Sequence, residues 1–182
     1  MKLLDKLLLV FLFVSLPLFA EDEEDAIIEE SDSAPTWLLT QDEIAYGSAQ
    51  LEGKPYVIHF WATWCPYCKR LQPGLESIAV DYKKTGIETY AISFWENVRA
   101  NPIREMKNRG LNLNVLVQGD DVAKSFGVQG TPTTIFVNHE GTVVSRYTLS
   151  DPNDPQIRLA YETLSDQFKD KDKPKVVPED EG

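Results

Sequence analysis

The chain holds only two cysteines, Cys65 and Cys68, and the sequence changes character where they stand. The residues before them, 56–61, are nearly continuously apolar, which is typical of a strand buried on both faces. After them, apolar side chains recur at helical spacing as far as about residue 84, and Gly86 follows. The pair therefore lies where a buried strand gives way to a helix, and this constrains the fold more than any other feature.

Strand-like and helix-like segments alternate along the rest of the chain. We predict strands at residues 87–94, 112–117, 133–137 and 142–148, and helices at residues 103–109, 120–126 and 155–169. Residues 37–50 are expected to form a lead-in with a short amphipathic helix. This order predicts an α/β fold, a mixed sheet of about five strands with helices on both faces. Such sheets hold their sites at the carboxyl ends of strands, where the cysteine pair follows its strand.

The two ends of the chain differ in composition from its middle. Residues 1–20 combine Lys2 and Lys6 with an apolar run ending in a small residue, which predicts a signal peptide cleaved after Ala20. The alternative is an uncleaved membrane anchor, although the run is broken by Pro17 and falls short of the roughly 20 residues that span a bilayer. We therefore predict a periplasmic protein, with an anchored form facing the periplasm as the alternative.

Charge and polarity set the expected limits of the folded part. Residues 21–35 form an acidic linker and residues 170–182 a polar tail, both predicted to be disordered, which leaves one domain at 36–169. The formal net charge of −11 argues against nucleic acid as a partner, because phosphate binding needs a basic face.

Two structural explanations of the cysteine pair are weak. A disulfide across two intervening residues closes a very small loop and removes little entropy from the unfolded chain. A zinc site needs a full set of Cys or His ligands, and the only histidines, His59 and His139, are well separated. A redox-active dithiol fits better, because a helix N-terminus favours a thiolate on Cys65. We expect Cys65 to be partly exposed and to attack, and the inward-facing Cys68 to resolve the mixed disulfide.

Three segments resemble the thioredoxin superfamily, and more narrowly its exported TlpA/ResA-like branch. They are residues 60–69 (FWATWCPYCK), the helix-bearing segment 101–110, and residues 130–137 (GTPTTIFV) followed by Gly141. The resemblance implies a thioredoxin-like fold and thiol–disulfide exchange. It also implies a cis Thr131–Pro132 bond beside the cysteines, where the Thr131 backbone would bind a substrate chain as an added strand.

Other residues near the pair divide between surface and core. We expect Trp64, Pro66 and Tyr67 on the substrate-facing surface and Trp61 in the core. No metal and no cofactor are expected.

Two positions depart from the family pattern. Leu71 stands where many reductases of this branch have an acid that tunes the thiols. His59, six residues before Cys65, stands where thioredoxins carry a buried Asp. A neutral His59 would relay the proton of Cys68, a protonated one would favour the Cys68 thiolate, and a core histidine would do neither.

Three functions are compatible with these features. The first is a reductase or exchanger of cysteine pairs in exported proteins, apocytochrome c among them, recharged by a membrane electron donor. The second is a disulfide oxidase or isomerase, although an isomerase normally has a dimerisation domain for which this chain has no room. The third is a non-catalytic binding module, against which the intact cysteine pair argues. We expect a monomer.

Overall fold

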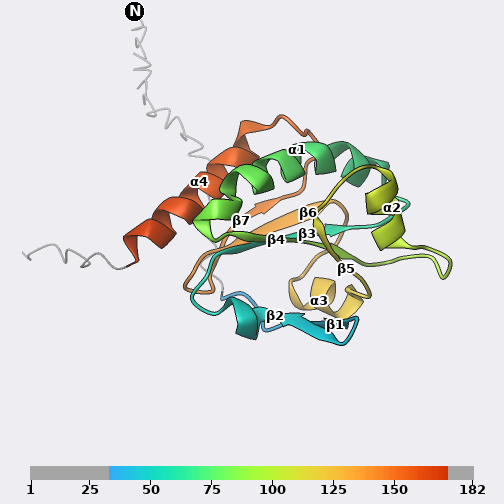
Figure 1. Ribbon diagram of the computed structural model, residues 1–182, viewed down its shortest axis with the longest axis horizontal. Coiled ribbons are helices and arrows are strands. Elements are labelled where there is room, and N and C mark those ends of the chain that lie inside the picture. Colours follow the sequence, from blue (N-terminus) through green and yellow to red (C-terminus); the bar gives the residue numbers. More distant parts are fainter. Residues whose placement is uncertain (1–32, 172–182) are drawn as a thin grey trace, which may run out of the picture.

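A five-stranded mixed sheet forms the centre of the computed structural model, which describes residues 33–171 (Figure 1). The strand order is β5-β4-β3-β6-β7. The strands are β3 (Tyr56–Trp61), β4 (Glu88–Ser93), β5 (Asn114–Leu116), β6 (Thr133–Val137) and β7 (Val143–Tyr147). The first three run parallel to one another, whereas β6 and β7 pair antiparallel. The predicted mixed sheet is therefore confirmed.

Helices cover both faces of this sheet. Those of the described residues are α1 (Pro66–Tyr82), α2 (Pro102–Asn108), α3 (Asp120–Ser125) and α4 (Pro155–Asp170), with short 3-10 turns η1 (Ser48–Leu51) and η2 (Lys83–Thr85). In Figure 1, α1 and α4 lie side by side over one face, and α3 lies against the other. The α2 helix sits beyond the edge strand β5 and close to the start of α1.

Capping residues decide where the helices begin. Asn101 Oδ1 accepts a hydrogen bond from the Arg104 amide at 2.8 Å, and Asp154 Oδ1 accepts one from the Gln156 amide at 2.9 Å. A proline occupies the first helical position after each cap, where its missing N–H costs no intrahelical bond. Both helix starts were predicted from the sequence and are confirmed.

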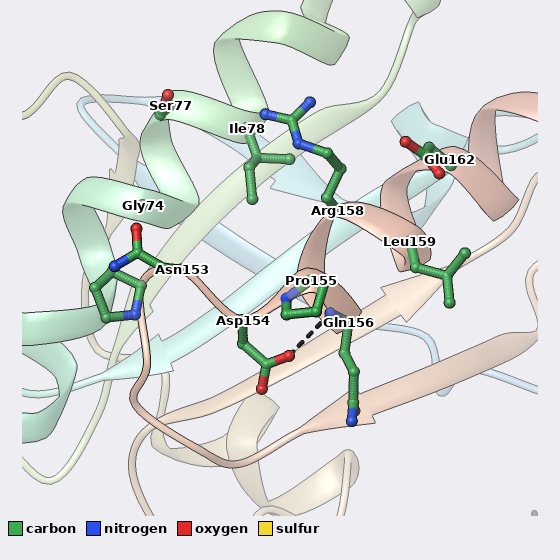
Figure 2. Close-up of a pocket in the computed structure, with 11 residues that line it drawn as sticks. Gly74, Ser77, Ile78, Asn153, Asp154, Pro155, Gln156, Arg158, Leu159 and Glu162 are labelled. Carbon is green, nitrogen blue, oxygen red and sulfur yellow. Dashed lines mark hydrogen bonds between the residues drawn. The ribbon is translucent and has the colours of Figure 1, made fainter.

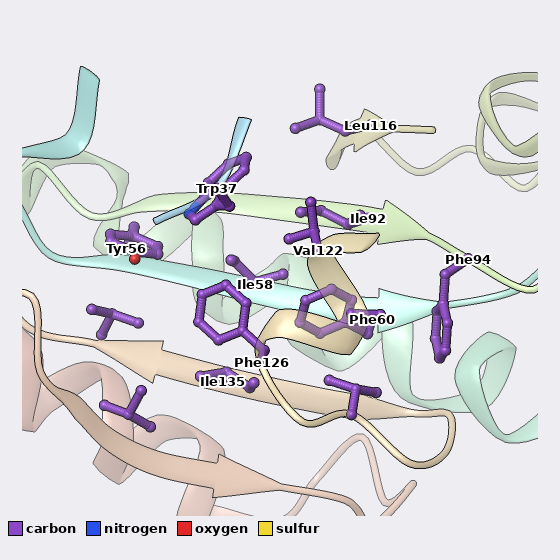
Figure 3. Close-up of a cluster of buried hydrophobic side chains, with 14 of the residues drawn as sticks. Trp37, Tyr56, Ile58, Phe60, Ile92, Phe94, Leu116, Val122, Phe126 and Ile135 are labelled. Atoms are coloured by element: carbon purple, nitrogen blue, oxygen red, sulfur yellow. The ribbon is translucent and has the colours of Figure 1, made fainter. Parts of the chain in front are cut away.

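The central strand β3 is buried along its whole length. Its side chains alternate between the two faces of the sheet. Ile58 and Phe60 pack under α3 against Val122 and Phe126 (Figure 3), while Val57 packs on the other face with side chains of α1 and α4. A third cluster surrounds the cysteines and includes Trp61, Ala62, Met106 and Leu113. The apolar run of residues 56–61 is thus explained by burial on both faces.

The segment before β3 differs from its prediction. In place of a short amphipathic helix, β1 (Leu38–Gln41) and β2 (Ile44–Gly47) form an antiparallel hairpin that continues into η1. The two turn residues, Asp42 and Glu43, both have positive φ, as a tight hairpin turn requires. Neither residue is the Gly or Asn that usually marks such a turn, so the sequence carried no hairpin signal.

The predicted signal peptide, most of the acidic linker and nearly all of the polar tail lie outside the described residues. Residues 33–35 of the linker are described and are attached to the hairpin after β6, since the Ala34 amide donates to the Gly141 carbonyl at 2.7 Å. Disorder is therefore wrong for these residues. The limits of the domain stay a prediction, with the last described helix ending at Asp170. No helix within residues 33–171 is long and apolar enough to cross a bilayer.

Candidate active site

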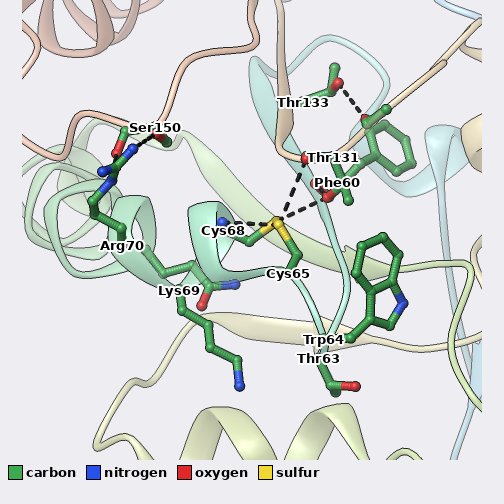
Figure 4. The surroundings of a disulfide bond; sticks show 12 residues. Phe60, Thr63, Trp64, Cys65, Cys68, Lys69, Arg70, Thr131, Thr133 and Ser150 are labelled. Atoms are coloured by element: carbon green, nitrogen blue, oxygen red, sulfur yellow. Dashed lines mark hydrogen bonds between the residues drawn. A yellow bond between two sulfur atoms is a disulfide. The ribbon is translucent and has the colours of Figure 1, made fainter.

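Cys65 and Cys68 form a disulfide at the carboxyl end of β3, with their Cα atoms 5.4 Å apart (Figure 4). Cys65 is the N-cap residue of α1, and Pro66 occupies the first helical position. The amide of Cys68 donates to the Cys65 sulfur at 3.1 Å. This amide and the positive end of the helix dipole would both stabilise a thiolate on Cys65 in the reduced pair.

Thr131 brings a distant segment against both sulfur atoms. Its carbonyl oxygen lies 3.7 Å from the sulfur of Cys65. Its hydroxyl oxygen lies 2.9 Å from the sulfur of Cys68 and donates to the Phe60 carbonyl at 3.1 Å. The Thr131–Pro132 peptide bond is cis, as the family resemblance implies.

The burial of the pair differs in part from the prediction. Cys68 is fully buried, on the inward side of the helix start. Cys65, which we expected to be partly exposed, is only 2% exposed. In the disulfide form its sulfur is turned into the cluster of Trp61 and Ala62 and lies beside Thr131. Spacing along the chain could not reveal this cover, because Thr131 comes from a segment far along the sequence.

The residues next to the buried disulfide in the sequence include exposed rings. Trp64 is 48% exposed and Tyr67 is 58% exposed, and Pro66 between them is exposed as well. Trp61 is fully buried, as expected for a core residue. The indole N–H of Trp64 donates to the Trp95 carbonyl at 2.7 Å, which holds this exposed ring in place.

Glu96 holds in place the loop that precedes the cysteine pair. One carboxylate oxygen accepts from the Thr63 amide at 2.8 Å, and the other accepts from the Thr63 hydroxyl at 2.6 Å. Glu96 follows Trp95, whose φ of 52° turns the chain after β4 and whose amide donates to Asp120 at 3.1 Å. Sequence reasoning missed this residue. Its position just after the carboxyl end of a central strand was the available signal.

We predict that Glu96→Ala slows disulfide exchange by about tenfold, because a misplaced reacting group loses the benefit of orientation. Two hydrogen bonds to Thr63 are lost, so the free energy of unfolding should also fall, by about 1–3 kcal/mol. Exchange with a small disulfide and urea unfolding measure the two effects. Glu43→Ala, at an exposed acid of the distant hairpin, is the control. Equal exchange rates in Glu96→Ala and Glu43→Ala would contradict this role of Glu96.

His59 lies on the α1 face of the sheet and is fully buried. Its Nδ1 atom is 3.0 Å from the hydroxyl of Thr134 on the neighbouring strand, and its Nε2 atom has no hydrogen-bond partner among residues 33–171. Burial, and secondly the positive charge of Arg109, lower the pKa of His59 from 6.5 to about 3. The protonated alternative is therefore wrong near neutral pH. A neutral proton relay stays a proposal.

The low pKa of His59 predicts a pH-dependent stability. The unfolded chain takes up a proton on this histidine below pH 6.5, whereas the folded chain does so only near pH 3. The stability that a neutral His59 contributes is thus complete above pH 6.5 and is lost as the pH falls toward 3. We expect urea unfolding to show about 2 kcal/mol less stability at pH 5 than at pH 7 from this source.

His59→Asn should remove this dependence, and His139→Asn, the same change at the other histidine, should retain it. A wild-type slope in His59→Asn would contradict the assignment.

One cavity of the described residues lies away from the cysteines. It measures about 710 Å³ and lies between α1 and the start of α4, where Asp154 caps the helix (Figure 2). A cavity of about 570 Å³ instead adjoins the pair and is lined in part by Tyr67, Thr131, Pro132 and Leu149. Within residues 33–171, no three His, Cys, Asp or Glu side chains are grouped to hold a metal ion.

A family model described as a thioredoxin-like domain matches residues 43–156. The chain belongs to the thioredoxin-like family. Two relatives in it are named thiol-disulfide oxidoreductase ResA. The protein from Halalkalibacterium halodurans is 33% identical over 101 residues, which cover 54% of this chain and 56% of that protein. The protein from Bacillus subtilis is 32% identical over 126 residues, which cover 66% of this chain and 68% of that protein.

The solved structures agree on the fold. A putative thiol:disulfide interchange protein DsbE from Chlorobium tepidum superposes with a TM-score of 0.63 at 21% identity, covering 72% of this chain and 96% of that one. This thioredoxin-like chain is thus a homologue of thiol-disulfide oxidoreductases and carries a CxxC pair at the start of α1.

Proposed function

We propose that this protein is an exported thiol-disulfide oxidoreductase that reduces or exchanges cysteine pairs in other exported proteins. The observation that carries the proposal is the Cys65–Cys68 disulfide at a helix N-terminus, with Thr131 against both sulfur atoms. A structural disulfide needs no such surroundings, whereas exchange needs a stabilised thiolate and a place for the substrate chain. The names of the relatives support the same chemistry.

The reaction moves two electrons through the pair. The Cys65 thiolate attacks a substrate disulfide, forms a mixed disulfide and releases one substrate sulfur as a thiolate. The Cys68 thiolate then attacks the Cys65 sulfur, which frees the second substrate sulfur and restores the Cys65–Cys68 disulfide. The substrate is reduced and the pair oxidised. A donor must return two electrons to the pair, and we propose a membrane electron donor.

Several surface features fit a polypeptide substrate. Trp64 and Tyr67, each next to a cysteine in the sequence, are exposed, and a cavity is lined in part by Tyr67, Thr131 and Pro132. A substrate strand that pairs with the Thr131 backbone would lie beside the cysteine pair. Export itself rests on the predicted signal peptide at residues 1–20, and apocytochrome c is a candidate substrate among exported proteins with cysteine pairs.

The opposite direction of electron flow has one observation in its favour. The position of the tuning acid is occupied by Leu71, which is buried and uncharged, and His59 is neutral. Without a carboxylate at position 71, the reduced pair keeps its thiolate more easily and the disulfide is a better oxidant. A disulfide oxidase is therefore the second candidate.

The reduction potential of the pair, measured against glutathione, tests both candidates. A reductase requires a value toward the roughly −270 mV of thioredoxin, whereas an oxidase requires one toward the roughly −120 mV of the strongest dithiol oxidants of this kind. A value at the oxidising end would refute the reductase. Failure of the reduced protein to exchange with any disulfide would refute both and favour a binding module.

A further inference from the structure

Pro73 lies within α1 and leaves one backbone carbonyl without its usual donor. Proline has no N–H, so the carbonyl four residues earlier, that of Lys69, loses its usual helical hydrogen bond. The structure supplies a replacement from another part of the chain. The guanidinium of Arg109, at the end of α2, donates to the Lys69 carbonyl and also to the side-chain oxygen of Gln72.

These contacts lie directly behind the cysteine pair. Lys69 follows Cys68 in the helix, and Gln72 lies one turn after Cys68 on the same buried face. Met106 of α2 packs in the cluster that contains both cysteines. The positive charge of Arg109 is also felt by the buried His59, whose pKa it helps to lower. Arg109 thus joins α2 to the part of α1 that carries Cys68.

Charged groups of α1 and α2 lie beside this contact. Lys69 Nζ forms a 2.7 Å salt bridge with Glu105. Burial lowers the pKa of Arg109, and the negative charge of Glu105 opposes this effect. These three groups, two cations and one carboxylate, together carry a charge of +1. Glu96, the other carboxylate of the site, is bonded to Thr63 in the entry loop. Leu71, in the position of the usual acid, adds no charge.

We propose that Arg109 is a positioning residue of the redox centre. It holds the turn of α1 after Cys68 through the carbonyl that Pro73 leaves free, and its charge favours the thiolate form of the reduced pair. This inference rests on the proposed function, since it concerns the same dithiol. In many reductases of this branch a carboxylate tunes the thiols. Here the cation Arg109 would tune them in the opposite direction, so the disulfide becomes easier to reduce.

The test is the thiol–disulfide equilibrium of Arg109→Gln with glutathione. Loss of the charge should disfavour the reduced pair by about tenfold, which corresponds to about 30 mV for a two-electron couple. The attacking thiol should also titrate at higher pH than in the wild type. Arg109→Lys, which keeps the charge, should restore most of both values. Arg104→Gln removes an exposed charge from the same helix and should change neither.

A second substitution, Pro73→Ala, separates the effect of the Arg109 charge from the effect of its hydrogen bond to the helix. In Pro73→Ala the Lys69 carbonyl regains a donor within α1, so Arg109→Gln should cost less stability there than beside Pro73. The shift in the equilibrium should nevertheless persist. An Arg109→Gln equilibrium equal to that of the wild type in both backgrounds, or equal shifts in Arg109→Gln and Arg104→Gln, would overturn the inference. Either result leaves the proposed function intact if the wild-type protein exchanges disulfides.

Discussion

Cys65→Ser is expected to abolish disulfide exchange, with a rate at least about a thousandfold below that of the wild type, because the nucleophile is lost. Cys68→Ser should behave differently. Its Cys65 thiolate can still attack, but no second thiolate follows, so the mixed disulfide with the substrate persists. Incubation with a disulfide-bonded protein, followed by non-reducing electrophoresis and mass spectrometry, measures the rate and the adduct.

The structure supports this division of roles, because the Cys65 sulfur accepts a hydrogen bond from the Cys68 amide at the start of α1. Cys68 is fully buried within the first turn of α1 and lies beside the Thr131 hydroxyl, whereas Cys65 is the residue that caps the helix. An adduct that accumulates on Cys65→Ser but not on Cys68→Ser would reverse the assignment. Urea unfolding of both variants serves as the control for folding.

Tyr161→Ala is expected to lower the free energy of unfolding by about 3–5 kcal/mol, the range for loss of a large buried aromatic side chain. Tyr161 is a fully buried residue of α4 and forms an edge contact with Phe136 at 5.5 Å between ring centroids. Its hydroxyl lies 2.8 Å from that of Thr89 on β4. The substitution leaves a cavity between helix and sheet, and also leaves the buried Thr89 hydroxyl without this partner.

Tyr161→Phe is the matched control, because it keeps the ring and removes only the hydroxyl. We expect it to cost about 1–2 kcal/mol, since a single buried hydrogen bond is lost. Chemical denaturation at pH 7 with a fixed protein concentration measures both variants. If Tyr161→Ala and Tyr161→Phe were equally destabilised, packing of the ring would not be what holds α4 on the sheet.

Local sequence signals were sufficient for most elements near the site. The apolar run of β3 and the Asn-Pro and Asp-Pro helix starts depend on side chains only a few residues apart, and they were predicted correctly. The β1–β2 hairpin was missed because its turn residues, Asp42 and Glu43, lack the usual chemistry. Its position is decided by Trp37, which is anchored in the core under β3 and β4.

The cysteine pair and its place before a helix were readable from spacing alone, because N-capping and the helix dipole act within one turn. Its surroundings were not. Thr131, Glu96 and Arg109 each contact a residue of the site that is at least 33 positions away in the sequence. Only the order of the strands in the sheet brings them there. The sequence by itself therefore determined the reacting atoms. The tertiary structure decided which residues cover the sulfur atoms, hold the neighbouring loop and helix in place and supply the nearby charge, since those contacts join residues that are far apart along the chain.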